Sequence, residues 1–281
     1  MKVIVTRPLL EAQTWVAQLQ AKGLEAIALP LIEIAAAKDS QVVADAVAVA
    51  RDNASHYAAI MFVSSNAVRH FYMKNQAVAG VNIAYSAINN IALSSRSIKT
   101  PRYWATGPGT AKALLAAGIA AHLIDAPAND AAQFDSEALW ERVRGQVKAG
   151  DRVLIVRGTT QQSSAENETL MNGRPWLADQ LISAGVQVDT VVSYERRAPV
   201  FNAEQMAWIE EASRDRSVWL FSSSEAIDNL HNAAKQIDWS KAKAIATHPR
   251  IAQAARRAGF GVVCESRPTL SDVVTSIESL V

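Results

Sequence analysis

The segment LQAKGLEAIAL at 19–29 joins a helix-like stretch to an apolar strand through a glycine, and this pattern occurs three more times. The other copies are LLAAGIAAHLI at 114–124, LISAGVQVDTV at 181–191 and ARRAGFGVVCE at 255–265. Glycine directly after a helix adopts the left-handed conformation without a Cβ penalty, and the apolar residues that follow are typical of a buried strand. Each copy therefore predicts a helix that ends at glycine and leads into a strand.

The strand-to-helix segments also recur, in the same order in both halves of the chain. Blocks 1–8, 60–71, 103–118 and 136–143 resemble blocks 151–158, 218–230, 244–259 and 271–280. The last pair opens with Ser136 and Ser271, each expected as a helix N-cap. Four matched blocks in one order indicate an internal duplication. Because alternating strands and helices form parallel sheets covered on both faces, the sequence predicts the α/β class with two similar doubly wound domains.

Length and composition set the class of protein. A chain of 281 residues is expected to form two domains, and its net charge of +1 argues against a nucleic-acid or membrane-surface binder. The single Cys264 excludes an intrachain disulfide and fits a reducing compartment. The start MKVIVTRPLL lacks the apolar core of a signal peptide. We therefore expect a cytoplasmic protein without a nucleic-acid or membrane partner. Residues 78–102 have no counterpart in the second half and are expected to form an inserted loop or short helix.

Polar residues follow several of the predicted strands where a helix begins. Ligands of parallel α/β sheets bind at the carboxyl ends of the strands, and helix N-termini present unpaired N–H groups and partial positive charge to anions. Serine or threonine at such a place is also a common N-cap, so each position alone has two interpretations. Their number favours an anion site. The candidates are Arg7, Ser64, Ser65, Asn66, Thr106, Gly107, Gly109, Thr110, Ser222, Ser223 and Ser224.

Motifs for a cofactor or metal are not found in the sequence. GPGTA at 107–111 lacks the lysine of a P-loop and the GxGxxG of a dinucleotide fold, and the five histidines show no paired metal spacing. We therefore expect no cofactor and no metal. His248 occupies the place that Gly107 holds in the first half, so it is either structural or faces the ligand.

Tyr194, in SYERR at 193–197, ends a predicted strand and precedes two arginines. A phenol at this place could donate a proton to a ligand. The alternative is an ordinary tyrosine at a strand end that is hydrogen-bonded to the backbone.

Taken together, these segments resemble uroporphyrinogen-III synthases from end to end, and the resemblance lies in VTRP at 5–8, FVSSNAV at 62–68, ATGPGTAKALLAAG at 105–118, DRVLIVRG at 151–158 and GVQVDTVVSYERR at 185–197. It implies flavodoxin-like domains joined by two crossing linkers. Residues 1–36 and 198–281 would form one domain, and residues 37–197 the other. The chain departs from the family at Val63, where threonine is frequent.

The same resemblance implies an activity and the residues for it. Uroporphyrinogen-III synthases close hydroxymethylbilane, a linear tetrapyrrole with eight carboxylates, into a ring with inversion of ring D and loss of water. The enzyme acts mainly by holding the substrate in one folded shape between two facing domains. By this resemblance Tyr194 is the general acid. The implied carboxylate binders are Ser64, Thr110, Ser222 and Ser223, with Arg7 and Arg157 either binding substrate or stabilising strand ends. We expect a monomer without a cofactor.

Two other classes of protein remain open from the sequence. A ligand-binding protein of the periplasmic-binding type, working in the cytoplasm, also pairs two α/β domains. A nucleotide-dependent transferase does so too, although no phosphate fingerprint supports it.

Overall fold

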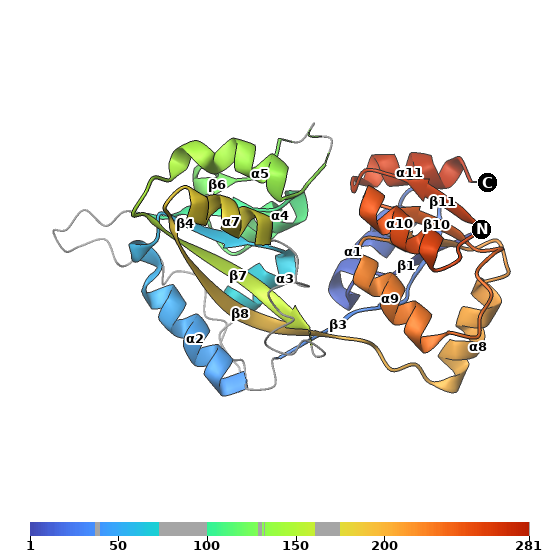
Figure 1. The fold of residues 1–281 in the computed structure, drawn as a ribbon. Helices are drawn as coiled ribbons and strands as arrows, with labels where there is room; N and C mark the ends of the chain where they lie inside the picture. The colour runs from blue at the N-terminus through green and yellow to red at the C-terminus, as the bar shows by residue number, and fades with distance from the viewer. Residues whose placement is uncertain (37–39, 73–99, 129–130, 132, 161–174, 281) are drawn as a thin grey trace. The chain divides into compact units, whose positions relative to one another are not determined.

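The computed structural model describes residues 1–36, 40–72, 100–128, 131, 133–160 and 175–280 (Figure 1). Most of the segment 78–102, expected as an insert, lies outside these residues. The chain folds into two compact units: unit 1 is Met1–Ile34 with Arg197–Val281, and unit 2 is Ala35–Arg196.

Unit 1 contains, in its described part, a five-stranded parallel sheet in the order β11-β10-β9-β1-β2. Its strands are β1 (Lys2–Val5), β2 (Glu25–Ala28), β9 (Val218–Phe221), β10 (Lys243–Ala246) and β11 (Val262–Glu265), and its helices are α1 (Leu9–Gln20), α8 (Ala203–Ala212), α9 (Ser224–Ala233), α10 (Pro249–Arg257) and α11 (Leu270–Glu278). Side chains alternate between the faces of a strand. Val218 therefore packs with α1 and α11, and Trp219 with α8, α9 and α10.

The described part of unit 2 contains a six-stranded sheet in the order β3-β8-β7-β4-β5-β6. Its strands are β3 (Glu33–Ala35), β4 (Ala59–Phe62), β5 (Arg102–Ala105), β6 (Ile124–Asp125), β7 (Arg152–Thr160) and β8 (Gln187–Arg197), and its helices are α2 (Ser40–Asp52), α3 (Ser65–Tyr72), α4 (Pro108–Ala116), α5 (Ser136–Val143) and α7 (Pro175–Ser183). Met61 and Trp104 pack with α5 and α7 on one face. Phe62, on the next position of β4, contacts Phe71 of α3 on the other.

The duplicated halves exchange strands between the units. The first half of the chain contributes β1 and β2 to unit 1 and β4, β5 and β6 to unit 2. The second half contributes β7 and β8 to unit 2 and the remaining three strands to unit 1. Matched blocks then occupy matched places, since the order β2-β1-β9-β10-β11 corresponds to β8-β7-β4-β5-β6. This 2-1-3-4-5 order is flavodoxin-like, and the predicted fold class is confirmed.

The four glycines of the repeated pattern end helices as the sequence predicts. Gly23, Gly118, Gly185 and Gly259 have φ values of 80°, 86°, 75° and 95°. At the first of them, the N–H of Gly23 donates to the Gln20 carbonyl at 2.9 Å and the N–H of Leu24 to the Leu19 carbonyl at 3.1 Å. The other three show the same pair of bonds. This pair is the Schellman motif, which requires the left-handed residue.

The predicted serine caps are wrong by one or two positions. Helix α5 is capped by Asp135 and α11 by Thr269, whose side chains each accept the backbone N–H three residues further on. Because a better placed oxygen precedes each serine, Ser136 lies in the first turn of α5 and Ser271 in that of α11.

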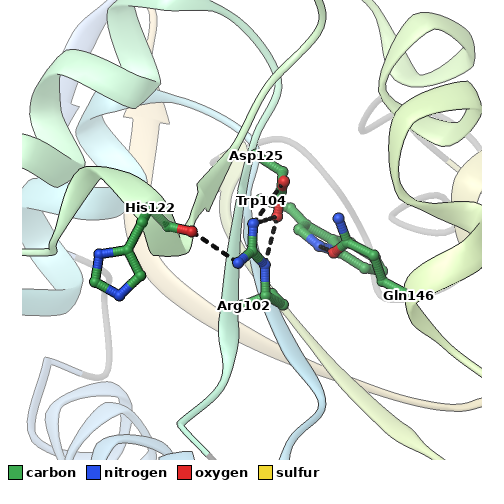
Figure 2. Close-up of polar contacts among 5 residues, drawn as sticks. All are labelled: Arg102, Trp104, His122, Asp125 and Gln146. Carbon is green, nitrogen blue, oxygen red and sulfur yellow. Dashed lines mark hydrogen bonds and ion pairs between the residues drawn. The ribbon is translucent and has the colours of Figure 1, made fainter.

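Arg102 joins the last two strands of the unit 2 sheet (Figure 2). Its Nε and Nη2 donate to the two carboxylate oxygens of Asp125 at 2.8 and 2.7 Å, and Nη1 donates to the His122 carbonyl at 2.7 Å. Beside it, the indole of Trp104 donates to Gln146 at 2.9 Å. Since the short strand β6 has one neighbour in this sheet, these bonds supplement its ladder.

Asp125→Ala is expected to lower the free energy of unfolding by about 1–2 kcal/mol, because it removes two charge-assisted bonds from a carboxylate that is 9% exposed. The figure allows for solvent screening at Arg102, which is 35% exposed. Urea denaturation followed by circular dichroism measures it. The matched control is Glu210→Ala, whose partner Arg214 is 61% exposed; it should cost about 0.5 kcal/mol or less. Equal losses of unfolding free energy in the two variants would contradict the inferred stabilisation by the Arg102–Asp125 pair.

Candidate functional site

The loops after β4 and β5 lie side by side at the carboxyl ends of the unit 2 strands. β4 and β5 are parallel neighbours, paired from Ala59 with Arg102 to Phe62 with Ala105. Directly after these strands, the hydroxyl of Thr106 donates to the Val63 carbonyl at 3.1 Å. The structure therefore brings the predicted SSN and TGPGT loops together.

Tyr194 of β8 lies at the same edge of the sheet. Its hydroxyl is 3.1 Å from Oγ of Ser64, and either atom can be the donor. The same Ser64 oxygen accepts the backbone N–H of Ala67 at 3.1 Å, so Ser64 is also the cap of α3. Tyr194 is 2% exposed. The tyrosine is thus bonded to a side chain at a helix N-terminus, rather than to the backbone as the alternative interpretation expects.

The ring of His70 lies next to that of Tyr194, with 5.5 Å between centroids and 31° between planes. Burial lowers the pKa of His70, and the neighbouring Arg69 cation lowers it further. The imidazole is therefore neutral near pH 7 and adds no positive charge beside the phenol.

A β-bulge places Tyr194, and sequence reasoning missed it. The register of β7 with β8 pairs Arg157 with Val192 but Gly158 with Tyr194, so Ser193 is an extra residue on β8. Its hydroxyl donates to the Arg157 carbonyl at 3.3 Å. The only signal in the sequence is that DRVLIVRG ends in glycine where MKVIVTRP ends in proline.

The first turn of α4 holds the predicted threonine. Gly107 is the residue before the helix, Pro108 begins it, and the N–H of Thr110 donates to the Gly107 carbonyl at 3.1 Å. Thr110 is 5% exposed. In the equivalent loop of unit 1, His248 accepts the N–H of Arg250 on Nδ1 at 3.1 Å, which makes this histidine the cap of α10.

The first turn of α9 in unit 1 differs from that of α3. Ser223 stands at the N-cap position but its side chain makes no capping bond, and Ser222 beside it is partly exposed. The simple N-cap interpretation therefore holds for Ser64 and is wrong for Ser223. In the first turn of α3, Ser65 is partly exposed and Asn66 is buried.

The two arginines expected at strand ends have different surroundings: Arg7 follows β1, whereas Arg157 lies inside β7, which continues to Thr160. The Arg7 guanidinium is 3.6 Å from the Glu11 carboxylate and lies 4.7 Å above the Trp15 ring. Burial lowers the pKa of Arg7, and Glu11 opposes this shift. The charge of Arg7 is thus paired within its own unit. Arg157 is partly exposed and lies at the bulge.

Neither a metal centre nor a membrane span is seen in the described ranges. There, histidine, cysteine, aspartate and glutamate form no group of three or more that could hold a metal ion. Of the helices in those ranges, none combines the length and hydropathy that crossing a bilayer requires.

Two solved structures and one family model resemble this chain. A mutant uroporphyrinogen III synthase from Thermus thermophilus is 16% identical, with 100% of this chain and 98% of that chain covered and a TM-score of 0.52. The uroporphyrinogen-III synthetase of Helicobacter pylori is 14% identical, with both chains covered completely and a TM-score of 0.55. At such identities the structures share a fold. The model of the family "Uroporphyrinogen-III synthase HemD" matches residues 13–275. Since this match spans most of the sequence, the chain belongs to the uroporphyrinogen-III synthase HemD family.

Proposed function

We propose that this chain binds hydroxymethylbilane at the carboxyl ends of its strands and closes it there to uroporphyrinogen III. The activity, that of a cyclising lyase, follows from the family. The place of reaction is inferred from the helix N-termini at those strand ends. Neither the family match nor the solved structures favour a binding protein of the periplasmic type.

Carboxylate recognition suits the residues at these ends. The helices α3, α4 and α9 each begin directly after a strand, and their first N–H groups and dipoles favour anions. We propose that Ser64, Thr110, Ser222 and Ser223 bind substrate carboxylates together with the neighbouring N–H groups. In this proposal the adjoining residues Ser65, Asn66, Thr106 and Gly107 belong to the same loops and also contribute to substrate binding.

We propose different roles for Arg157 and Arg7. Arg157 is partly exposed beside the bulge between β7 and β8 and suits a substrate carboxylate. Arg7 already pairs with Glu11 and stacks on Trp15, which favours a structural role at the end of β1.

The single observation that carries the proposed chemistry is the bond between Tyr194 and Ser64. A tyrosine fixed at a helix N-terminus can protonate the terminal hydroxyl of hydroxymethylbilane, which then leaves as water. The resulting azafulvene cation is attacked by the ring D carbon that carries the bridge to ring C, which gives a spirocyclic intermediate. That bridge bond breaks and reforms at the free α-carbon of ring D, so the ring is inverted, and the proton lost from this carbon balances the one that Tyr194 donated. The phenolate left on Tyr194 is stabilised by the partial positive charge at the start of α3.

The isomer of the product tests the activity. Purified protein would be mixed with freshly made hydroxymethylbilane, and the oxidised products separated by chromatography. We expect isomer III, with the ring D inversion, at a rate proportional to enzyme concentration. Only isomer I, which forms spontaneously, would contradict the proposal.

Thr110→Val is expected to raise KM about 10-fold to 100-fold and change kcat little. Valine keeps the shape of threonine and removes one charge-assisted hydrogen bond, worth about 1.5–3 kcal/mol. Steady-state kinetics and a thermal melt measure both effects. The matched control is Thr275→Val on α11, where the side chain is exposed. A lower melting temperature with an unchanged KM would assign Thr110 to the fold instead.

We further propose that units 1 and 2 are the two domains expected at 1–36 with 198–281 and at 37–197; the compact units support this. The protein would work as a cytoplasmic monomer, for which its single cysteine is suited. Size-exclusion chromatography with light scattering checks the oligomeric state.

A further inference from the structure

We propose that Gly158 and the one-residue bulge opposite it are positioning elements, which hold the phenol of Tyr194 against Ser64. The inference rests on the proposed role of Tyr194 as the proton donor. It assigns a function in this reaction to a glycine that acts through Tyr194.

The ring of Tyr194 occupies the space of a side chain at position 158. A Cβ added to Gly158 would lie 2.4 Å from Cζ of Tyr194, 2.6 Å from Cε2 and 2.8 Å from Cε1. Carbon atoms in contact are normally about 3.5–4.0 Å apart, so the ring would move by more than about 1 Å. The three atoms lie at the far end of the side chain, so we expect a rotation of the ring, rather than a shift of the strand, to relieve the clash. Alanine at 158 is therefore expected to displace the hydroxyl and leave the sheet intact.

The bulge determines which residue of β8 meets that glycine. If the pairing continued past Arg157 without the bulge, position 158 would pair with Ser193 and not with Tyr194, because Arg157 pairs with Val192. One-residue bulges re-aim the side chains that follow them and often lie beside active sites. Here the bulge turns the phenol toward the start of α3, which the hydrogen bond to Ser64 marks.

The matched segments of unit 1 lack this glycine and this tyrosine. Pro8 stands at the place of Gly158, and Ile32 at the place of Tyr194, when the matched segments are aligned through Gly23 and Gly185. In unit 1 the pairing of β1 with β2 runs from Lys2 with Glu25 to Val5 with Ala28 and ends before Arg7 and Pro8, the counterparts of Arg157 and Gly158. Ile32 is 5% exposed and belongs to an apolar cluster. The glycine and the tyrosine thus occur together in unit 2 and not in the matched segments of unit 1, so the shared fold does not require this pair.

A double-mutant cycle between positions 158 and 194 tests the proposal. Gly158→Ala is expected to lower kcat about 10²-fold with little change in KM, since a displacement of about 1 Å can cost that much. In the Tyr194→Phe background the same change should lower kcat by less than about twofold, because the hydroxyl that it displaces is already gone. The matched control is Gly145→Ala, where an added Cβ meets nothing within 4 Å; its kcat should equal that of the wild type.

A spectroscopic readout separates positioning from activity. In protein labelled with ¹³C at tyrosine Cζ, the signal of Tyr194 is identified by its loss in Tyr194→Phe. We expect Gly158→Ala to move this signal and Gly145→Ala to leave it in place. If Tyr194→Phe keeps full kcat, the proposed acid is wrong. If the signal stays in place, or if Gly158→Ala lowers kcat equally in both backgrounds, the positioning proposal itself is overturned.

Should Gly158→Ala not fold, Ser193→Ala replaces it in the cycle. This milder change removes the 3.3 Å bond from the Ser193 hydroxyl to the Arg157 carbonyl and keeps the extra residue. We expect kcat to fall about threefold to tenfold with Tyr194 present and to stay constant with phenylalanine there. Equal losses in both backgrounds would overturn the proposal.

Discussion

Tyr194→Phe is expected to lower kcat by about 10²–10⁴-fold, the usual contribution of a general acid, with KM nearly unchanged. Phenylalanine keeps the ring that lies over Gly158 and removes only the hydroxyl, which is 3.1 Å from Ser64. Formation of isomer III under substrate saturation measures the rate.

The matched control is Tyr57→Phe. Tyr57 is 7% exposed and precedes β4, at the amino end of the same sheet. Burial and the neighbouring Asp189 raise the pKa of its phenol, so this hydroxyl also lies in a polar contact. We expect its loss to leave kcat unchanged. Tyr194 is 2% exposed, and a buried hydroxyl can also stabilise the fold. If that were its only role, Tyr194→Phe would lower the melting temperature and keep kcat, which would contradict the prediction.

Trp219→Ala is expected to lower the free energy of unfolding by about 3–5 kcal/mol, the largest stability effect that we predict. Trp219 is fully buried in β9. Its ring is 5.3 Å from that of Trp239 and 6.3 Å from that of Phe260, both edge-on, and it stacks on Phe221 at 6.2 Å. Alanine leaves a cavity among three aromatic rings that the strand cannot close. Urea denaturation followed by circular dichroism gives the change.

The matched control for this change is Trp176→Ala in α7. Its side chain is 37% exposed, so the same substitution should cost about 1 kcal/mol or less. Similar losses at the two tryptophans would show that the aromatic cluster does not stabilise unit 1 as inferred.

The fold could be predicted from the sequence because its signals are local. Glycine is favoured directly after a helix because it adopts the left-handed conformation without a Cβ penalty, and all four glycines predicted at such places have positive φ. The order of the matched blocks also predicts two similar parallel sheets. The exchange of strands between the units is implied by the family resemblance and not by the block order. The N-caps of α5 and α11 differ from the predicted serines because Asp135 and Thr269 offer competing oxygens one residue and two residues earlier in the chain.

The candidate site could be predicted only in part, because its geometry depends on distant pairings. Ser64 and Tyr194 are 130 positions apart, and the register of β7 with β8 brings the phenol to the hydroxyl. Similar serine loops also behave differently: Ser64 caps α3, whereas Ser223 makes no capping bond. Local sequence states which groups are present. The tertiary structure determines which of these groups already form hydrogen bonds within the protein.

Binding of the product tests the central claim most directly, namely that the strand carboxyl ends bind the polycarboxylate substrate. Uroporphyrinogen III would be titrated anaerobically into ¹⁵N-labelled protein, and the shifts of backbone amides followed by NMR. We expect the largest shifts in the first turns of α3, α4 and α9. Shifts confined to the amino ends of the strands, near Tyr57, Gly145 and Arg152, would contradict it.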